Sequence, residues 1–192
     1  MSLAGNWQRI VRLGAVWHKP LRHGLPSEPN ALQATAQLSY VITSEAQQRI
    51  DDHAGANRET EVGGLLVGEV HEDQGRYLVR VTEALAARHT IGGPVSLTFT
   101  GRTWLDILAR RSQIDDVVTV GWYHSHPRLG VFLSEMDLFG HRHFFGGACW
   151  YLALVVDPVA DEQGVFVWNG DQIVRSGSGV SDPPASERSR LL

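Results

Sequence analysis

The sequence predicts one α/β domain, in which helices pack against a β-sheet. Residues 117–123 are mostly β-branched, aromatic or otherwise apolar, which is typical of a buried strand. Strand-like and helix-like stretches alternate along most of the chain. The 192 residues suffice for one domain with a sizeable core and short extensions.

The N-terminal residues 1–36 differ from the rest and predict an arm outside the domain. Trp7 and Trp17 lie among apolar residues that glycines interrupt, and three prolines follow between residues 20 and 29. Two interpretations remain open. The segment is either an arm that docks a partner protein or a second copy of the chain, or an apolar strap or partly disordered extension of its own domain.

The domain is predicted to begin with a strand and a helix. Residues 37–42 alternate weakly between apolar and polar side chains, which favours a strand. Ser44 and Gln47 fit the capping box that opens a helix. Apolar residues recur at helical spacing from Ala46 to Ala54, so an amphipathic helix is expected to about residue 57.

A hairpin is predicted next. Residues 62–70 favour a glycine-rich strand, residues 71–75 a turn, and residues 76–82 the second strand. The glycines of the first strand allow another backbone to come close.

The following stretch is less regular. Residues 84–95 predict a plain loop, residues 96–99 a short strand, and residues 101–113 a helix with one apolar side. Asp115 and Asp116 then lead into the central strand.

The C-terminal third continues the alternation. A helix is expected from Ser134 to Phe145, followed by strands at residues 150–156 and 165–168. Residues 175–192 contain glycine, serine, proline and mixed charge, which predicts a flexible tail. The domain itself is therefore expected to span residues 37–174.

Composition narrows the class of protein. The net charge of −4 argues against nucleic acid as the main partner. The single cysteine, Cys149, excludes an intrachain disulfide, favours a reducing compartment and is expected to be a buried core thiol. No apolar run reaches the ~18 residues of a membrane-spanning helix, and no signal peptide is recognisable. We expect a cytoplasmic protein with no membrane association.

Two histidines mark the end of the central strand. His124 and His126 are two residues apart, so their side chains point to the same face of a strand, and Pro127 ends the pairing. Asp137 falls in the first turn of the following helix, where it can face back toward the histidines. The same residues fit a capping box with Ser134 as the N-cap, and the two interpretations are compatible.

Two histidines and one carboxylate with an open fourth position are typical of catalytic zinc, so one ion is predicted at His124, His126 and Asp137. Bound zinc lowers the pKa of a water ligand to about 7. Glu61, at the head of the glycine-rich strand, is the candidate general base. Ser134 is the candidate donor to a developing oxyanion.

The chain resembles the JAMM metallopeptidases, or MPN-plus domains, over roughly residues 38–170. Their pattern is a glutamate, then His-x-His, seven residues, Ser, two residues and Asp, and the five candidate residues fill it. The resemblance implies a curved mixed β-sheet flanked by helices, in a three-layer arrangement similar to cytidine deaminase. It also implies a mobile substrate-facing insertion as the alternative for residues 84–95. The compact chain looks most like stand-alone prokaryotic members.

The resemblance further implies a zinc-dependent isopeptidase. Its substrate would be ubiquitin, a ubiquitin-like modifier or a conjugate of either, cleaved after the C-terminal tail of the modifier. Two alternatives belong to other classes: a non-catalytic MPN module that scaffolds a complex, and a DNA-associated protein similar to RadC. His141, on the helix after Asp137, is expected to be a surface residue, with a second-shell or substrate contact as the alternative. His143 is expected to face elsewhere, and no function is assigned to it.

Overall fold

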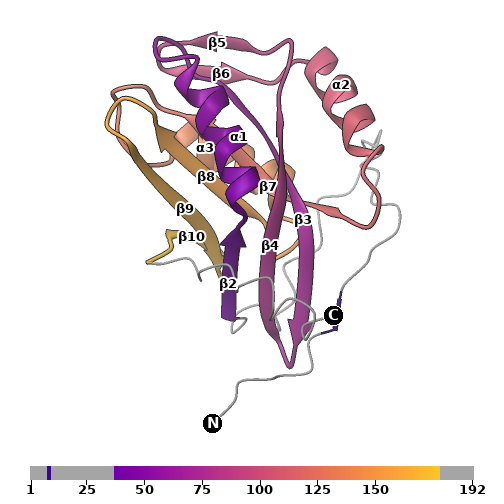
Figure 1. Ribbon diagram of the computed structural model, residues 1–192. Coiled ribbons are helices and arrows are strands. Elements are labelled where there is room, and N and C mark those ends of the chain that lie inside the picture. Colours follow the sequence, from indigo (N-terminus) through magenta and orange to yellow (C-terminus); the bar gives the residue numbers. More distant parts are fainter. Residues whose placement is uncertain (1–7, 10–36, 178–192) are drawn as a thin grey trace, which may run out of the picture.

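The computed structural model describes residues 8–9 and 37–177, and these are built around one mixed β-sheet (Figure 1). Along the sheet the strands follow the order β10-β9-β8-β7-β3-β4-β2, and β1 pairs with the far end of β3. Neighbours are antiparallel except for the pairs β2–β4 and β7–β8. The strands are β1 (Gln8–Arg9), β2 (Gln37–Ile42), β3 (Gly63–Asp73), β4 (Arg76–Ala86), β7 (Val118–Ser125), β8 (Leu152–Asp157), β9 (Glu162–Asn169) and β10 (Gln172–Arg175).

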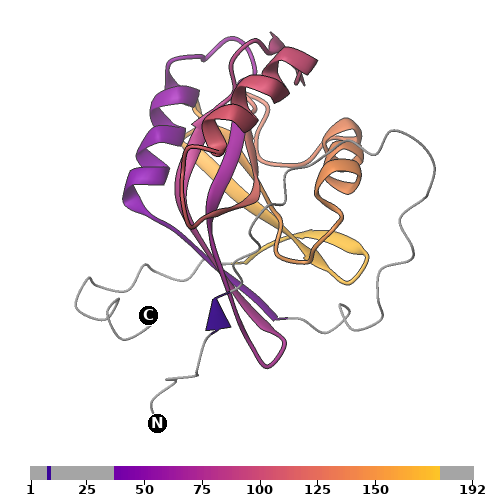
Figure 2. The ribbon, with the colours of Figure 1, turned by 90° about the vertical axis from the view of Figure 1, so that its right-hand side faces the viewer.

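Three helices cover the two faces of this sheet, so the predicted α/β class and the curved mixed sheet are confirmed (Figure 2). Helix α1 (Ser44–Gly55) buries Ala46, Ile50 and Ala54 on one face. Helices α2 (Gly101–Arg111) and α3 (Glu135–Phe145) bury Ile107 and Phe145 on the other. Because both faces are covered, β8 is buried along its whole length, and its residues are all apolar up to Asp157 at its end.

A bulge in β7 decides which face receives the two histidines. Val118 and Val120 pack on the α1 side, yet Trp122 packs on the side of α2 and α3. Leu66 pairs with Gly121 and Val67 with Thr119, so Val120 is the extra residue of a bulge. A one-residue shift turns every later side chain to the opposite face. His124 therefore follows Trp122 to the face where α3 begins.

Several predicted boundaries need correction. The N-cap of α1 is Thr43, whose hydroxyl accepts from the Ala46 N–H, and not Ser44. Both hairpin strands are longer than predicted, so His71 lies in β3 and the turn is confined to Gln74 and Gly75. The strand at residues 165–168 is not the last, because β10 follows it. Strand β10 has only four residues, too few for an alternation of apolar and polar side chains to indicate a strand.

The segment at residues 84–95 is also more ordered than a plain loop. Its first three residues complete β4. The hairpin of β5 (Ile91–Gly93) and β6 (Ser96–Thr98) then forms a separate two-stranded sheet.

The terminal predictions lie mostly outside the described residues. Within the predicted arm only Gln8 and Arg9 are described, and they pair with Glu72 and His71. Residues 178–192 of the predicted tail are likewise outside the described part of the chain. Among the described helices, none is long and apolar enough to cross a membrane.

Candidate metal centre

Three side chains converge where β7 ends and α3 begins. His124 and His126 point their Nε2 atoms at each other, 3.0 Å apart. Asp137, in the first turn of α3, places Oδ1 3.4 Å from His124 Nε2 and Oδ2 3.6 Å from His126 Nε2. His124, His126 and Asp137 thus form a group that could hold a metal ion.

The spacing of these donor atoms fits zinc. A tetrahedral ion with ligands at about 2.0–2.1 Å holds its donor atoms about 3.3 Å apart. The two Nε2 atoms are 3.0 Å apart, and each lies near that distance from a different oxygen of Asp137, at 3.4 Å for His124 and 3.6 Å for His126. Two imidazoles and one carboxylate also match the donor types that zinc takes in catalytic sites.

Ser134 holds the carboxylate in place. It is the N-cap of α3, and both bonds of a capping box with Asp137 are present. Asp137 Oδ2 accepts from the Ser134 hydroxyl at 2.6 Å and from the Ser134 N–H at 2.8 Å. Burial opposes ionisation of Asp137, but hydrogen bonds to His124 and His126 hold its pKa well below the usual value. The carboxylate is thereby charged and held facing the two histidines.

Glu61 lies beside this group without belonging to it. Its carboxyl Oε1 is 3.8 Å from His126 Nε2, and its side chain is almost fully buried. Burial raises the pKa of Glu61 to about 7, and the nearby His126 offsets only part of that effect. A carboxyl group with a pKa near neutrality can both take and return a proton, which a general base must do.

His124 is oriented by an aromatic neighbour that the sequence patterns did not single out. The ring of Trp122 stacks on the His124 ring, with centroids 4.6 Å apart and planes 8° apart. Trp122 Nε1 donates in turn to His141 Nδ1 at 3.0 Å. The signal was available, because Trp122 precedes His124 by two residues and so shares its face.

The surface position expected for His141 is wrong. Its side chain is fully buried, between Trp122 and the ring of Trp168, 5.2 Å away. Burial lowers the pKa of His141 to about 4, so the ring is neutral. Its place four residues after Asp137 puts it on the helix face toward the sheet. His143 is exposed, and Cys149 is half-buried rather than the buried core thiol that was expected.

The β5–β6 hairpin packs directly against Glu61. The backbone N–H of Glu61 donates to the carbonyl of Gly93 at 2.8 Å. A Cβ atom on Gly92 would lie 2.5 Å from the Glu61 carbonyl oxygen, too close for the backbone to tolerate unmoved. The close approach of this hairpin therefore requires glycine at position 92.

Gly92→Ala is expected to displace Glu61 and reduce any turnover that depends on it by up to about 10²-fold, with metal content unchanged. The matched control is Gly93→Ala, since a Cβ there meets only the movable Ser96 hydroxyl closely, at 2.9 Å. Turnover and zinc content measured on both variants check this. Equal turnover in the two variants would show that the hairpin does not fix Glu61.

Comparisons with known proteins show which family this chain belongs to. A model of the family described as JAB1/Mov34/MPN/PAD-1 ubiquitin protease matches residues 35–145. The 26S proteasome non-ATPase regulatory subunit 14 of Drosophila melanogaster is 31% identical over 170 residues, 86% of this chain and 52% of that protein. The ubiquitin carboxyl-terminal hydrolase RPN11 of Saccharomyces cerevisiae is 30% identical over 145 residues, 73% and 45% of the two chains. The chain thus spans about half the length of these curated relatives.

A solved structure shares the fold. The solution structure of a protein from Desulfitobacterium hafniense superposes with a TM-score of 0.56 at 17% identity. The match covers 74% of this chain and 92% of that one.

Proposed function

Because this chain belongs to the JAB1/Mov34/MPN/PAD-1 family, we propose that it is a zinc-dependent isopeptidase. It would cleave the amide bond after the C-terminal tail of ubiquitin or a ubiquitin-like modifier. The observation that supports this most directly is the convergence of His124, His126 and Asp137 with Glu61 alongside. In the proposed assignment, His124, His126 and Asp137 hold one zinc ion, and Glu61 and Ser134 act on the substrate.

The chemistry that zinc supplies when bound is a water nucleophile available near neutral pH. Glu61 would take the proton of the attacking water on a carboxylate oxygen and pass it to the leaving amine. The raised pKa of Glu61, about 7, suits both transfers.

Ser134 would stabilise the negative charge that develops on the carbonyl oxygen of the substrate. Its hydroxyl now donates to Asp137 Oδ2 at 2.6 Å. In the proposed role the hydroxyl turns from that oxygen toward the substrate. The Ser134 N–H, which donates to the same Oδ2 at 2.8 Å, would keep Asp137 in place meanwhile.

The β5–β6 hairpin is the proposed substrate-facing segment. It contacts the backbone of Glu61 through Gly93, and Ile91 and Val95 are exposed on it. An extended, glycine-containing tail could lie against such a strand edge and gain backbone hydrogen bonds, while narrow walls would exclude larger side chains. In the same proposal, residues 1–36 remain an arm that contacts a partner, and the site of action is the cytoplasm.

The direct test is cleavage of defined substrates by the purified chain. Ubiquitin and ubiquitin-like proteins, each joined through the C-terminal glycine to a lysine side chain, are incubated with zinc-loaded protein. We expect release of the free modifier, loss of release after chelation, and recovery when zinc is returned. A zinc-loaded chain that binds a modifier but cleaves none of its conjugates would point to the scaffold alternative instead.

A further inference from the structure

We propose that Asp157 is a positioning residue that sets the orientation of the metal ligand His126. The inference rests on the proposed function, because it concerns the zinc site. Asp157 is the last residue of β8, which runs parallel to β7 and next to it. It touches neither the candidate ligands nor Glu61 in any contact that the described residues show, and it acts through the turn that follows His126.

The Asp157 carboxylate binds two turns at once. Its Oδ1 accepts from the Arg128 N–H at 3.1 Å and its Oδ2 from the Gly130 N–H at 3.0 Å. Oδ1 also accepts from the N–H groups of Val159 and Ala160, at 2.9 and 3.2 Å, in the turn after β8. The side chain is 1% exposed. Four backbone donors around one buried carboxylate make a rigid junction between the two turns.

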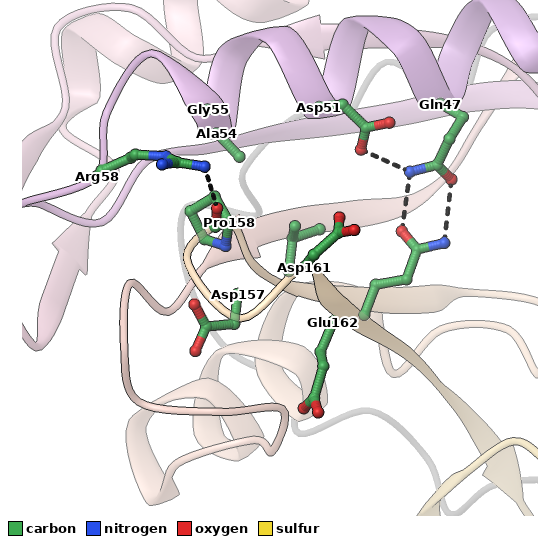
Figure 3. A pocket seen from close by; sticks show the side chains of 11 residues that line it. Gln47, Asp51, Ala54, Gly55, Arg58, Asp157, Pro158, Asp161 and Glu162 are labelled. Carbon is green, nitrogen blue, oxygen red and sulfur yellow. Dashed lines mark hydrogen bonds between the residues drawn. The ribbon is translucent and has the colours of Figure 1, made fainter.

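Figure 3 shows how Asp157 differs from the other acidic residues nearby. It lies at the edge of a pocket between α1 and the turn after β8, together with Asp161 and Glu162. Its carboxylate points away from both of those residues. Asp157 therefore serves the turn after His126, whereas Asp161 and Glu162 are exposed.

The turn acts on His126 through the Gly130 carbonyl. That oxygen lies 3.3 Å from His126 Nδ1. A carbonyl oxygen can only accept, so Nδ1 carries the proton and Nε2 presents its lone pair. Nε2 is the atom that faces His124 and Asp137. A second hydrogen bond of this kind fixes the tautomer and the ring orientation of a metal-binding histidine.

The turn after His126 needs contacts from outside it, because the backbone of Arg128 is strained. Arg128 has a φ of +65°, which is uncommon for a residue other than glycine, and Gly130 has a φ of +83°. Glycine adopts a positive φ without steric cost, but the conformation of Arg128 costs free energy and persists only where the surroundings enforce it. The Arg128 guanidinium also donates to the Arg58 carbonyl and to Glu59, both at 3.1 Å. The turn held by Asp157 therefore also reaches the segment just before Glu61.

His124 has no equivalent support. Its Nδ1 is buried and has no hydrogen-bond partner among the described residues, and its ring is held by stacking on Trp122. Loss of the Asp157 carboxylate should consequently disturb one ligand, His126, and leave His124 in place.

The test compares Asp157→Asn with Asp161→Asn in the full chain. Asparagine keeps the shape of aspartate but replaces one accepting oxygen with an NH₂ group that cannot accept. We expect zinc affinity, measured by competition with a chromogenic chelator, to fall by about 10–100-fold in Asp157→Asn. Asp161→Asn is the matched control, since Asp161 is exposed in the same turn and its φ of +57° suits asparagine. Its zinc affinity should stay at the wild-type value.

A second variant keeps the test valid if Asp157→Asn does not fold. A Cβ on Gly130 would meet nothing within 4 Å, but the φ of +83° is unfavourable for alanine. Gly130→Ala should therefore move the carbonyl that His126 uses and lower zinc affinity in the same direction. Folding of each variant is checked by circular dichroism before metal is added.

Nitrogen NMR of ¹⁵N-histidine-labelled, zinc-loaded protein adds a readout at the His126 ring itself, with proton exchange at the other histidine rings as the reference for a general loss of stability. The His126 Nδ1 proton should exchange with solvent faster in Asp157→Asn than in wild type, at a temperature where both are folded. A folded Asp157→Asn protein with wild-type zinc affinity and wild-type exchange would overturn the inference alone. A wild-type chain that binds no zinc would overturn the proposed function and the inference together.

Discussion

Replacing Glu61 with glutamine is expected to leave zinc bound and to reduce cleavage of a ubiquitin-like conjugate by about 10²–10⁴-fold. Glutamine has the shape of glutamate but cannot take a proton from water at neutral pH. The carboxyl of Glu61 lies outside the ligand group, 3.8 Å from His126 Nε2. Metal binding should therefore depend little on its charge, while proton transfer depends on it entirely.

The control for this variant is Glu59→Gln, two residues earlier. The Glu59 side chain is 79% exposed and pairs with Arg128. Its charge therefore lies at the surface, near the turn that follows His126. We expect Glu59→Gln to retain near wild-type turnover. Single-turnover cleavage and zinc content are measured for both variants. Normal turnover in Glu61→Gln would refute the role of Glu61 as the general base.

Replacing His124 with alanine should remove stoichiometric zinc and abolish cleavage. His124 is fully buried and offers Nε2 to the site, so its loss leaves two donors where zinc sites normally have at least three. Zinc should also stop stabilising the fold. A ligand present at 100 times its dissociation constant stabilises the native state by about 2.7 kcal/mol, and this gain should be seen in wild type only.

His143→Ala is the matched control for that experiment. His143 lies on α3 but is exposed, and its ring stacks on Phe139 and meets the Phe144 ring edge-on. Zinc content after dialysis is measured by elemental analysis, and the melting temperature is measured with and without zinc. One zinc ion per chain in His124→Ala would show that the ion sits elsewhere.

The sequence could predict those parts of the site that depend on residues close together in the chain. His124 and His126 share a face because a strand has a period of two, and their Nε2 atoms do meet. Asp137 faces them because Ser134 caps the helix, and the capping box sets the angle of the first turn. Both signals lie within four residues, so tertiary packing had little room to override them.

The parts that sequence could not predict depend on contacts between distant residues. The bulge at Val120 determines on which face of the sheet the His124 side chain lies. Nothing in the local sequence pattern indicates this bulge. Asp157 ends an apolar strand and precedes a proline, a pattern that indicates only the end of a strand. Its hydrogen bonds to Arg128 and Gly130 join residues 29 and 27 positions away.

The most direct test of the central claim is X-ray diffraction from zinc-soaked crystals at the zinc absorption edge. The account predicts one anomalous peak between His124 Nε2, His126 Nε2 and Asp137, with Glu61 close by but outside the coordination sphere. An anomalous map with no peak there, or with its only peak on other residues, would contradict it.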